Sequence, residues 1–330
     1  MCTTHTNWHT QKFRAMGCQM TIWLEQADAD LAATLLASAE TQIHQIERSL
    51  TRFDETSELS QLNARSGQWL PVSGVLWEVT LLALQLAQAT GGLFDPTVHN
   101  AIRAAGYTHS FDRIGDKPRA NHAHNEKARN HPNLYGCWRE IQVDIARQAI
   151  RLPLGIGIDF GGIGKGWTAQ KIVAQLSEWG ACLMDAGGDL TAGNGPQGWP
   201  GWPVGIARPS AIQQESSADD ALARLWLCNN SLATSGIDYR QWQHNGHAMH
   251  HLIDPRSGYP ANTDLLTVSV LARDAAVAEA WATAVLIAGQ SVGYQLLQQW
   301  QIAAACIEDD GTGDLSLFLT PAMKSFVQFN

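Results

Sequence analysis

The segment DFGGIGKGWTAQ, Asp159 to Gln170, follows an apolar stretch and places four glycines within six positions before a helical pattern begins. Glycines this close together let a backbone approach a ligand without interference from Cβ atoms, and they readily adopt positive φ angles. The start of a helix also offers unpaired N–H groups and the positive end of its dipole to a phosphate. Lys165 adds a formal charge at the same point. The segment therefore indicates a diphosphate site, and a tight strand-to-helix turn without a ligand is the alternative.

Two familiar phosphate-binding motifs do not fit this segment. A Walker A loop would need a glycine at Asp159 and a hydroxyl residue at Gly166. The dinucleotide motif G-x-G-x-x-G fails because Trp167 stands where its last glycine would be. If the segment binds a nucleotide, it does so through a motif other than these two.

The sequence on either side of this turn alternates between helical and strand patterns. Apolar residues recur at helical spacing in four segments: 27–50, 75–90, 167–179 and 274–287, the last ended by Gly289. Strands are predicted at 13–24 with a bend at Gly17, and then at 141–143, 149–152, 204–207, 225–227 and 267–272. Residues 182–193 are predicted to form a strand, a double-glycine turn and a second strand. Because the strands follow one another as hairpins, with a few long helices, we predict an α+β fold with mixed or antiparallel sheets and packed helices. No repeat or linker divides residues 1–330, which indicates a single domain.

Composition narrows the class of protein. The chain has 22 Lys and Arg against 31 Asp and Glu, a net charge of −9. That balance argues against a nucleic-acid partner, which would favour a basic face, and it is compatible with attraction of a divalent cation. Six cysteines are scattered without a C-x-x-C pair, so neither a zinc knuckle nor a disulfide framework is predicted.

The N-terminus and the apolar stretches bear on localisation. The first residues, MCTTHTNWHTQKFRAMG, contain no apolar signal region, and the longest apolar stretches are too short for a transmembrane segment. The sequence as it stands predicts a soluble cytoplasmic protein. Cys2 leaves an alternative, because a lipid-modified protein begins with cysteine once its leader is removed. In that case the protein would be periplasmic or lipid-anchored.

Two histidine-containing segments invite a metal interpretation. Residues 107–139 lose periodicity and gain His, Asn, Arg and Pro, which predicts a surface insertion or long loop. His122, His124 and His131 lie in this segment, where a metal site is the alternative to solvated loop histidines. The four histidines between His244 and His251 have no spacing typical of a zinc site. Solvated loop histidines are the simpler interpretation of both segments.

Eight short motifs occur in order along the chain: AMG near the start, SELSQLN, GLFDPTV, DFGGIGKGW, DAGGDL, LATSG with YR, HLIDPRSG and AEAWATAVLIAG. This series resembles the FAD:protein FMN transferase (ApbE-type) family. It runs from about Ala15 to Gly289 and so covers most of the chain. Each motif alone is weak, but eight in the same order are specific. The resemblance implies an ApbE-like flavin transferase fold.

The resemblance also implies a reaction. Such an enzyme uses Mg²⁺ and FAD, and transfers FMN to a threonine or serine hydroxyl of an acceptor flavoprotein, with release of AMP. Phosphoryl transfer of this kind depends mainly on positioning and charge neutralisation. A glycine-rich backbone and a bound metal would supply both. The resemblance does not identify the acceptor protein.

Residue by residue, the resemblance assigns three sets of positions. His251 matches a histidine proposed to take part in catalysis. Flavin-nucleotide contacts match Met16, Phe53, Leu93, Phe94, Asp95, Gly161, Trp167 and Ile253. The metal site matches the backbone carbonyl of Gly164 and the side chains of Glu279 and Thr283.

Three departures from the family pattern bear on these assignments. Phe53 stands where a tyrosine is common, which keeps stacking and loses a hydroxyl. Glu279 stands where aspartate is usual, and Ala282 stands where some members carry a further aspartate. Glu279 and Thr283 are four residues apart on a predicted helix, so they share one face. Since the neighbouring residues are apolar, a buried Glu279 is expected to need a counter-charge. The departures predict weaker Mg²⁺ binding than in relatives with both aspartates.

Two other functions fit the same residues. One is a flavin-binding protein that holds FAD without transferring it. The other is an FAD pyrophosphatase, in which water takes the place of the acceptor hydroxyl and the products are FMN and AMP. The sequence alone leaves both alternatives open.

Overall fold

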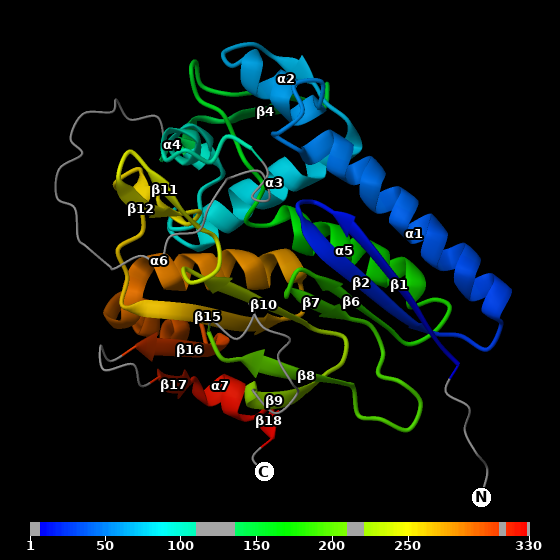
Figure 1. Cartoon of the computed structure of the whole chain (residues 1–330). Helices are drawn as coiled ribbons and strands as arrows, with labels where there is room; N and C mark the ends of the chain where they lie inside the picture. Colours follow the sequence, from blue (N-terminus) through cyan, green and yellow to red (C-terminus); the bar gives the residue numbers. More distant parts are fainter. Residues whose placement is uncertain (1–6, 110–135, 210–220, 310–314, 329–330) are drawn as a thin grey trace, which may run out of the picture.

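The computed structural model describes residues 7–109, 136–209, 221–309 and 315–328. An eight-stranded sheet runs through the middle of the molecule (Figure 1), and all the neighbouring strands in it are antiparallel. In spatial order its strands are β1 (Trp8–Ala15), β2 (Cys18–Glu25), β6 (Cys182–Ala186), β7 (Leu190–Ala192), β10 (Ser231–Gly236), β15 (Leu265–Ala272), β16 (Ala303–Asp309) and β17 (Leu315–Leu319). This confirms the predicted α+β class.

Helices cover one face of the large sheet. In Figure 1 α5 (Gly164–Leu176) lies over β6 and β7, and α6 (Ala275–Gln299) lies over β10 and β15. α1 (Ala29–Leu50) packs on β1 and β2, where its apolar residues Leu36 and Ile43 are buried with those of α5. The remaining helices are α2 (Glu58–Ala64), α3 (Gly74–Ala89), α4 (His99–Ala104) and α7 (Pro321–Lys324).

A second, smaller sheet covers the opposite face. It consists of β18 (Val327–Gln328), β9 (Ala221–Leu227) and β8 (Trp202–Ala207), and with α7 it buries apolar side chains of β7, β10 and β16. The strand β6, CLMDA, therefore has buried side chains on both faces. Three two- or three-stranded pieces complete the described fold: β3 (Leu70–Pro71) with β5 (Ala149–Arg151) and β4 (Gln142–Asp144), β11 (Gln241–His244) with β12 (His247–His250), and β13 (Ile253–Asp254) with β14 (Tyr259–Pro260).

Local sequence explains most element ends. The bend predicted at Gly17 is a two-residue hairpin turn in which Met16 and Gly17 have φ angles of 50° and 73°. Positive φ at both turn residues is typical of the type I′ turn, whose twist matches the flanking strands. Asp28, Ser57 and Asp274 cap α1, α2 and α6 through their side chains. The predicted end at Gly289 is confirmed, because this residue has non-helical angles (φ 75°, ψ 175°) and α6 is kinked there.

Two predictions on chain organisation have different outcomes. Most of the predicted surface insertion at 107–139 falls outside the described residues, as do His122, His124 and His131, so it stays a prediction. Among the described residues one helix, α6, has the length and apolar character of a membrane span. Its most apolar window is 61% buried within the fold. That is the behaviour of a core helix.

Candidate active site

The glycine-rich turn is held at its start by Asp159. The Asp159 backbone N–H donates to the Pro96 carbonyl at 2.8 Å, and its Oδ1 accepts from the Gly161 N–H at 2.6 Å. Its Oδ2 lies 2.5 Å from Nε of Arg52, whose side chain is 7% exposed. The turn is thus fixed by an ion pair with Arg52, the second residue after α1.

The helix after the turn begins earlier than predicted. α5 starts at Gly164 rather than Trp167, since the N–H groups of Ile163 and Gly164 already donate to the Phe160 carbonyl. The next glycine explains why the helix can start here. A Cβ on Gly166 would lie 2.6 Å from Glu279 Oε2 and 2.9 Å from the Ala275 carbonyl carbon. Only glycine lets α5 approach the start of α6 this closely.

Replacing Gly166 with alanine is therefore expected to destabilise the fold by about 1–3 kcal/mol, because a backbone contact must open. Gly164→Ala is the matched control in the same helix. A Cβ there would make ordinary contacts, at 3.6 Å to Met16 and 3.7 Å to Phe160. Urea unfolding of both variants is the measurement, and equal stability of the two would show that the close approach at Gly166 is not required.

A buried charge cluster lies where α5 meets α6. The Lys165 Nζ lies 2.7 Å from Glu279 Oε1 and 2.7 Å from Asp189 Oδ2, and none of the three side chains is more than 14% exposed. The Gly166 N–H donates to the other Glu279 oxygen at 2.9 Å. The counter-charge predicted for Glu279 is thus present, and it is Lys165. In this structure Lys165 and the Gly166 N–H both contact Glu279, and the expectation that this segment binds a diphosphate stays a prediction.

The protonation of this cluster is set by burial and by its opposite charges. Burial raises the pKa of Glu279 to about 7, although the Lys165 ammonium opposes that shift. Burial alone would lower the pKa of Lys165, but Asp189 and Glu279 outweigh it and raise that pKa above its ordinary value. Lys165 therefore stays charged throughout the physiological range.

Two residues of β10 contact the cluster and the neighbouring turn of α6. The Thr234 N–H donates to Asp189 Oδ1 at 3.0 Å, and Ser235 Oγ lies 3.0 Å from Thr283 Oγ1. Asp189 itself is placed by the double-glycine turn between β6 and β7, where Gly187 and Gly188 have positive φ angles. The DFGGIGKGW, DAGGDL, LATSG and AEAWATAVLIAG motifs, far apart in sequence, therefore meet at one place.

The oxygen atoms here suit a hard cation. Carboxylates, hydroxyls and backbone carbonyls are ligands that Mg²⁺ accepts, and Glu279, Thr283 and the Gly164 carbonyl provide one of each. The Gly164 carbonyl already accepts from Thr168 Oγ1 at 2.7 Å. Within the described residues no group of three or more His, Cys, Asp or Glu side chains is arranged to hold a metal. A cation would have to share Glu279 with Lys165.

His251 lies near this cluster on the loop after β12. Its Nδ1 is buried without a hydrogen-bond partner among the described residues. Burial lowers its pKa well below 6.5, and the positive charges of Arg240 and Lys165 add to that shift. His251 is therefore neutral at pH 7 and able to accept a proton. Asp254, another possible partner, is instead held by Arg256 at 2.8 Å.

The predicted flavin-contacting residues fall into two groups. Met16 and Phe94 border the glycine turn, since a Cβ on Gly164 would contact Met16 and one on Gly162 would contact Phe94. Phe53 and Ile253 belong to an apolar wall with Tyr107 and Trp242, in which the Phe53 and Tyr107 ring centroids are 5.9 Å apart. Leu93 is half-buried beside Phe94, and Trp167 is a residue of α5 that is buried in the core.

Asp95 lies below the turn in an unusual environment. It is 4% exposed, and its Oδ1 accepts from the N–H and the hydroxyl of Thr97 at 2.7 Å and 2.6 Å. Its Oδ2 is buried with no partner among the described residues. Burial raises the pKa of this carboxyl. A buried acceptor without a partner is costly, so Asp95 remains available for a ligand's donor group.

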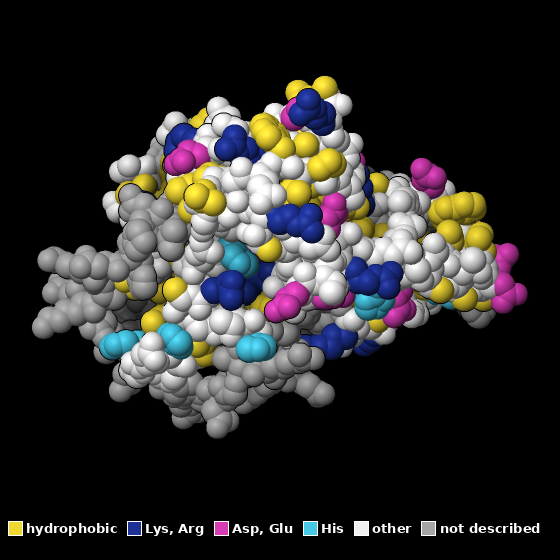
Figure 2. All heavy atoms as spheres, turned by 90° about the horizontal axis from the view of Figure 1, so that it is seen from above, with side chains coloured by type: hydrophobic (Ala, Val, Ile, Leu, Met, Phe, Trp, Pro, Cys, Tyr) yellow, Lys and Arg dark blue, Asp and Glu magenta, His cyan; other side chains and the backbone are white. Residues whose placement is uncertain are grey.

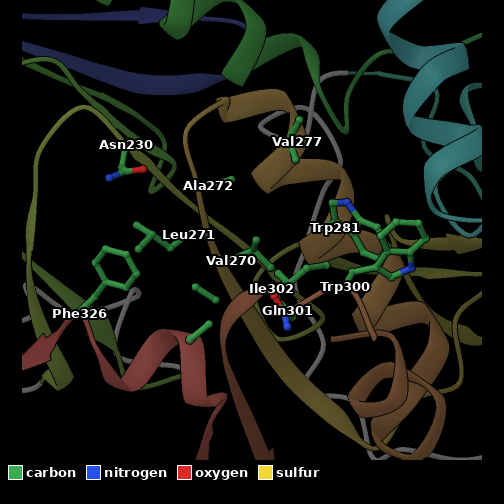
Figure 3. Close-up of a pocket in the computed structure, with 12 residues that line it drawn as sticks. Asn230, Val270, Leu271, Ala272, Val277, Trp281, Trp300, Gln301, Ile302 and Phe326 are labelled. Atoms are coloured by element: carbon green, nitrogen blue, oxygen red, sulfur yellow. The ribbon is translucent and has the colours of Figure 1, made fainter. Parts of the chain in front are cut away.

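An apolar pocket of about 410 Å³ lies elsewhere, between α6, β15 and α7 (Figure 3). The figure shows Trp281 and Trp300 side by side at one end and Phe326 at the other. Its lining contains no ionisable side chain and none of the predicted site residues: Asn230, Val270, Leu271, Ala272, Val277, Trp281, Trp300, Gln301, Ile302, Ala303, Ala322 and Phe326. The charge cluster is therefore the better candidate for phosphate chemistry.

Sequence reasoning missed several residues of the site. The sequence indicated Lys165 only as a charge beside a diphosphate and indicated no role for Asp189, and it did not single out Arg52, Tyr107 or Trp242. A signal existed only for Lys165, because a buried glutamate on α6 requires a cation. The aromatic pairing of Tyr107 with Trp242, 135 positions later in the chain, has no local sequence signal.

Comparisons with known proteins identify the family of the chain. The chain is 24% identical over 323 residues to the FAD:protein FMN transferase of Klebsiella pneumoniae (95% of this chain, 88% of that protein). It is 28% identical over 303 residues to that of Treponema pallidum (86% and 79%). The ApbE protein of Thermotoga maritima has the same fold, with a TM-score of 0.80 at 22% identity over 98% of this chain and 100% of that one. The apo flavinyl transferase ApbE of Pseudomonas stutzeri gives 0.78 at 20% identity (97% and 96%). Residues 16–307 match the ApbE family as a whole, and the chain belongs to that family.

Proposed function

We propose that this protein is an FAD:protein FMN transferase. The observation that carries the proposal is the meeting of the glycine-rich turn, the Lys165–Asp189–Glu279 cluster and His251 at one end of α5 and α6. Relatives named as FAD:protein FMN transferases align over most of the chain and support the same activity. The acceptor is a flavoprotein that offers a threonine or serine hydroxyl.

The reaction can be written from the residues present. The acceptor oxygen attacks the FMN phosphorus of FAD, a new phosphoester bond forms, and the bond to the AMP oxygen breaks. His251 takes the hydroxyl proton, since it is neutral and has a free ring nitrogen. The backbone at Gly161–Gly164 lies against the diphosphate, and the wall of Phe53, Tyr107 and Ile253 packs against the flavin.

Mg²⁺ would be held by Glu279, Thr283 and the Gly164 carbonyl. When bound there it neutralises charge on the diphosphate. Glu279 and Thr283 lie one turn apart on α6, and Ser235 fixes the Thr283 hydroxyl. Lys165 and Mg²⁺ would share the Glu279 carboxylate.

One incubation separates this proposal from its two alternatives. The protein is incubated with FAD, Mg²⁺ and a peptide or protein carrying an acceptor threonine. Covalent FMN on the acceptor, seen by mass spectrometry with release of AMP, supports the transferase. Free FMN and AMP with an unmodified acceptor would indicate FAD hydrolysis, and unchanged FAD would indicate a binding protein.

The glycine turn gives a prediction on nucleotide binding. Gly161→Val is expected to weaken FAD binding severely, because a branched side chain fills the path of the diphosphate. Folding should survive, since Gly161 is exposed and its Cβ would meet only the Asp159 carboxylate, at 2.8 Å. Gly74→Val is the control, at the start of α3, where an added Cβ meets nothing within 4 Å. Fluorescence titration measures FAD affinity. Unchanged FAD affinity of Gly161→Val would reject the turn as part of the site.

The proposed metal site gives a prediction on Mg²⁺ binding. Glu279→Gln is expected to weaken metal binding on the order of tenfold or more, because a carboxylate ligand is lost. Direct Mn²⁺ binding, followed by electron paramagnetic resonance, measures this without relying on activity. Parent activity in excess EDTA is the companion measurement. Full activity of the parent in EDTA, or unchanged Mn²⁺ binding by Glu279→Gln, would contradict the metal assignment.

A further inference from the structure

Three cationic side chains surround the candidate site, and two of them are neutralised within the fold. Lys165 lies between Asp189 and Glu279, and Arg52 pairs with Asp159. The third, Arg240, is half-buried, and no side chain among the described residues forms an ion pair or hydrogen bond with its guanidinium. A half-buried arginine without a carboxylate partner is unusual, because its charge is partly removed from water without compensation.

Arg240 is presented by a loop that is fixed at both ends. The loop joins β10 to β11, and the Gln241 side chain donates to the Ile237 carbonyl at 2.6 Å. On the next residue, the Trp242 indole N–H donates to the Ala105 carbonyl at 2.7 Å. The Trp242 and Tyr107 ring centroids are 5.1 Å apart, which ties the loop to the predicted flavin wall. The position of Arg240 is therefore built into the fold.

The positive charge of Arg240 affects the pKa values of three residues of the site. Its charge adds to burial in lowering the pKa of His251. It opposes the rise that burial causes in the pKa of Tyr107, and it opposes the rise in that of Lys165. Trp242, two residues after Arg240, pairs with Tyr107 of the flavin wall, and the charge of Arg240 acts on both His251 and Lys165. In the face shown in Figure 2, basic and histidine side chains gather at a hollow near its middle, with acidic side chains beside them.

The formal charges of these groups show which of them can attract an anion. Lys165 with its two carboxylates carries a net charge of about −1 when all are ionised, and Arg52 with Asp159 is neutral. Neither group attracts an anion. Arg240 carries +1 beside His251, and a guanidinium fork matches phosphate oxygens in a bidentate manner. A diphosphate is the anion that the proposed function brings to this place.

We propose that Arg240 binds a phosphate of the FAD diphosphate through its guanidinium and is the residue that fixes the phosphate beside His251. This inference rests on the proposed function, since FAD is its ligand. In this proposal the arginine of the YR pair after LATSG binds phosphate, and Lys165 pairs only with Asp189 and Glu279.

Flavin binding with and without phosphate tests the proposal. Riboflavin, FMN and FAD are titrated by flavin fluorescence into the parent, Arg240→Ala and Arg240→Lys. Arg147→Ala is the matched control, because Arg147 is 77% exposed and pairs only with neighbouring Asp144. Arg240→Ala is expected to bind FAD about 10- to 100-fold more weakly, the loss typical of a hydrogen bond to a charged group. Riboflavin affinity should change less than about twofold, within the effect of a surface substitution. Arg240→Lys should recover part of the FAD affinity.

The FMN titration shows which phosphate is bound. A loss for FMN equal to that for FAD assigns Arg240 to the FMN phosphate, and a loss for FAD alone assigns it to the AMP phosphate. Equal losses for riboflavin and FAD would overturn the proposal and give Arg240 a structural role. Unchanged FAD affinity in Arg240→Ala would also overturn it. A parent that binds no flavin would overturn the proposed function itself, and with it this inference. If Arg240→Ala does not fold, Arg240→Gln replaces it in the same comparison.

Discussion

Replacement of Lys165 by methionine is expected to lower the free energy of unfolding by about 3–5 kcal/mol, the range found when one partner of a buried ion pair is removed. Asp189 and Glu279 would then face each other, 14% and 5% exposed, without a cation. Lys171→Met is the matched control. Lys171 lies on the same helix and contacts Glu78 at 2.6 Å, but both side chains are about half exposed. A surface pair of this kind contributes about 0–1 kcal/mol.

The pH dependence of this loss identifies its cause. The raised pKa of Lys165 means that its contribution in the parent is complete below the unfolded pKa of about 10.4 and is lost only as pH rises above that value. In Lys165→Met the buried carboxylates can take up a proton, so the loss of stability should be smaller at pH 5 than at pH 8. Urea unfolding of the parent and both variants at these two pH values measures this. A double variant with Glu279→Gln should recover part of the loss. Equal effects of Lys165→Met and Lys171→Met would show that the cluster does not hold α5 to α6.

Replacement of His251 by alanine is expected to slow FMN transfer by about 10²–10⁴-fold, the usual contribution of a general base. FAD affinity should change far less, because the base acts on the acceptor hydroxyl rather than on the nucleotide. His247→Ala is the control, since His247 lies exposed on the neighbouring strand β12. Single-turnover transfer rates and FAD titrations give the two quantities separately. Equal losses in rate and in affinity would mean that His251 orients a phosphate instead.

The lowered pKa of His251 also predicts how the transfer rate depends on pH. Because burial and Arg240 hold this pKa well below 6.5, the parent should keep its transfer rate as pH falls to 6.5 and lose it only below that value. The free energy of unfolding of the parent should also decrease as pH falls. A histidine buried in its neutral form stabilises the protein above its unfolded pKa, and that contribution is lost as pH falls. His251→Ala should remove the acid limb of the rate profile, and an unchanged profile would exclude His251 as the base.

Local sequence predicted most of the helices and hairpins correctly. The Gly17 bend, the helix caps and the double-glycine turn at Gly187 depend on residues within a few positions of each other. Propensity and capping act at that range, so the sequence carries the signal. The start of α5 was placed three residues late. Its first turn depends on how closely α6 packs at Gly166, and that contact is made with residues more than 100 positions away.

The sequence by itself determined the class of fold, the buried nature of Glu279 and its need for a counter-charge, because burial and charge follow from residue type and periodicity. The ordered motifs also determined the family. Only the tertiary structure decided that Lys165 supplies that charge, that Asp189 shares it, and that the Arg240 guanidinium has no side-chain partner among the described residues. Ion pairs are set by which side chains the sheet order brings within a few ångströms. In this fold the strand order places β7 beside β10 and α5 beside α6, and no local pattern in the sequence encodes those neighbours.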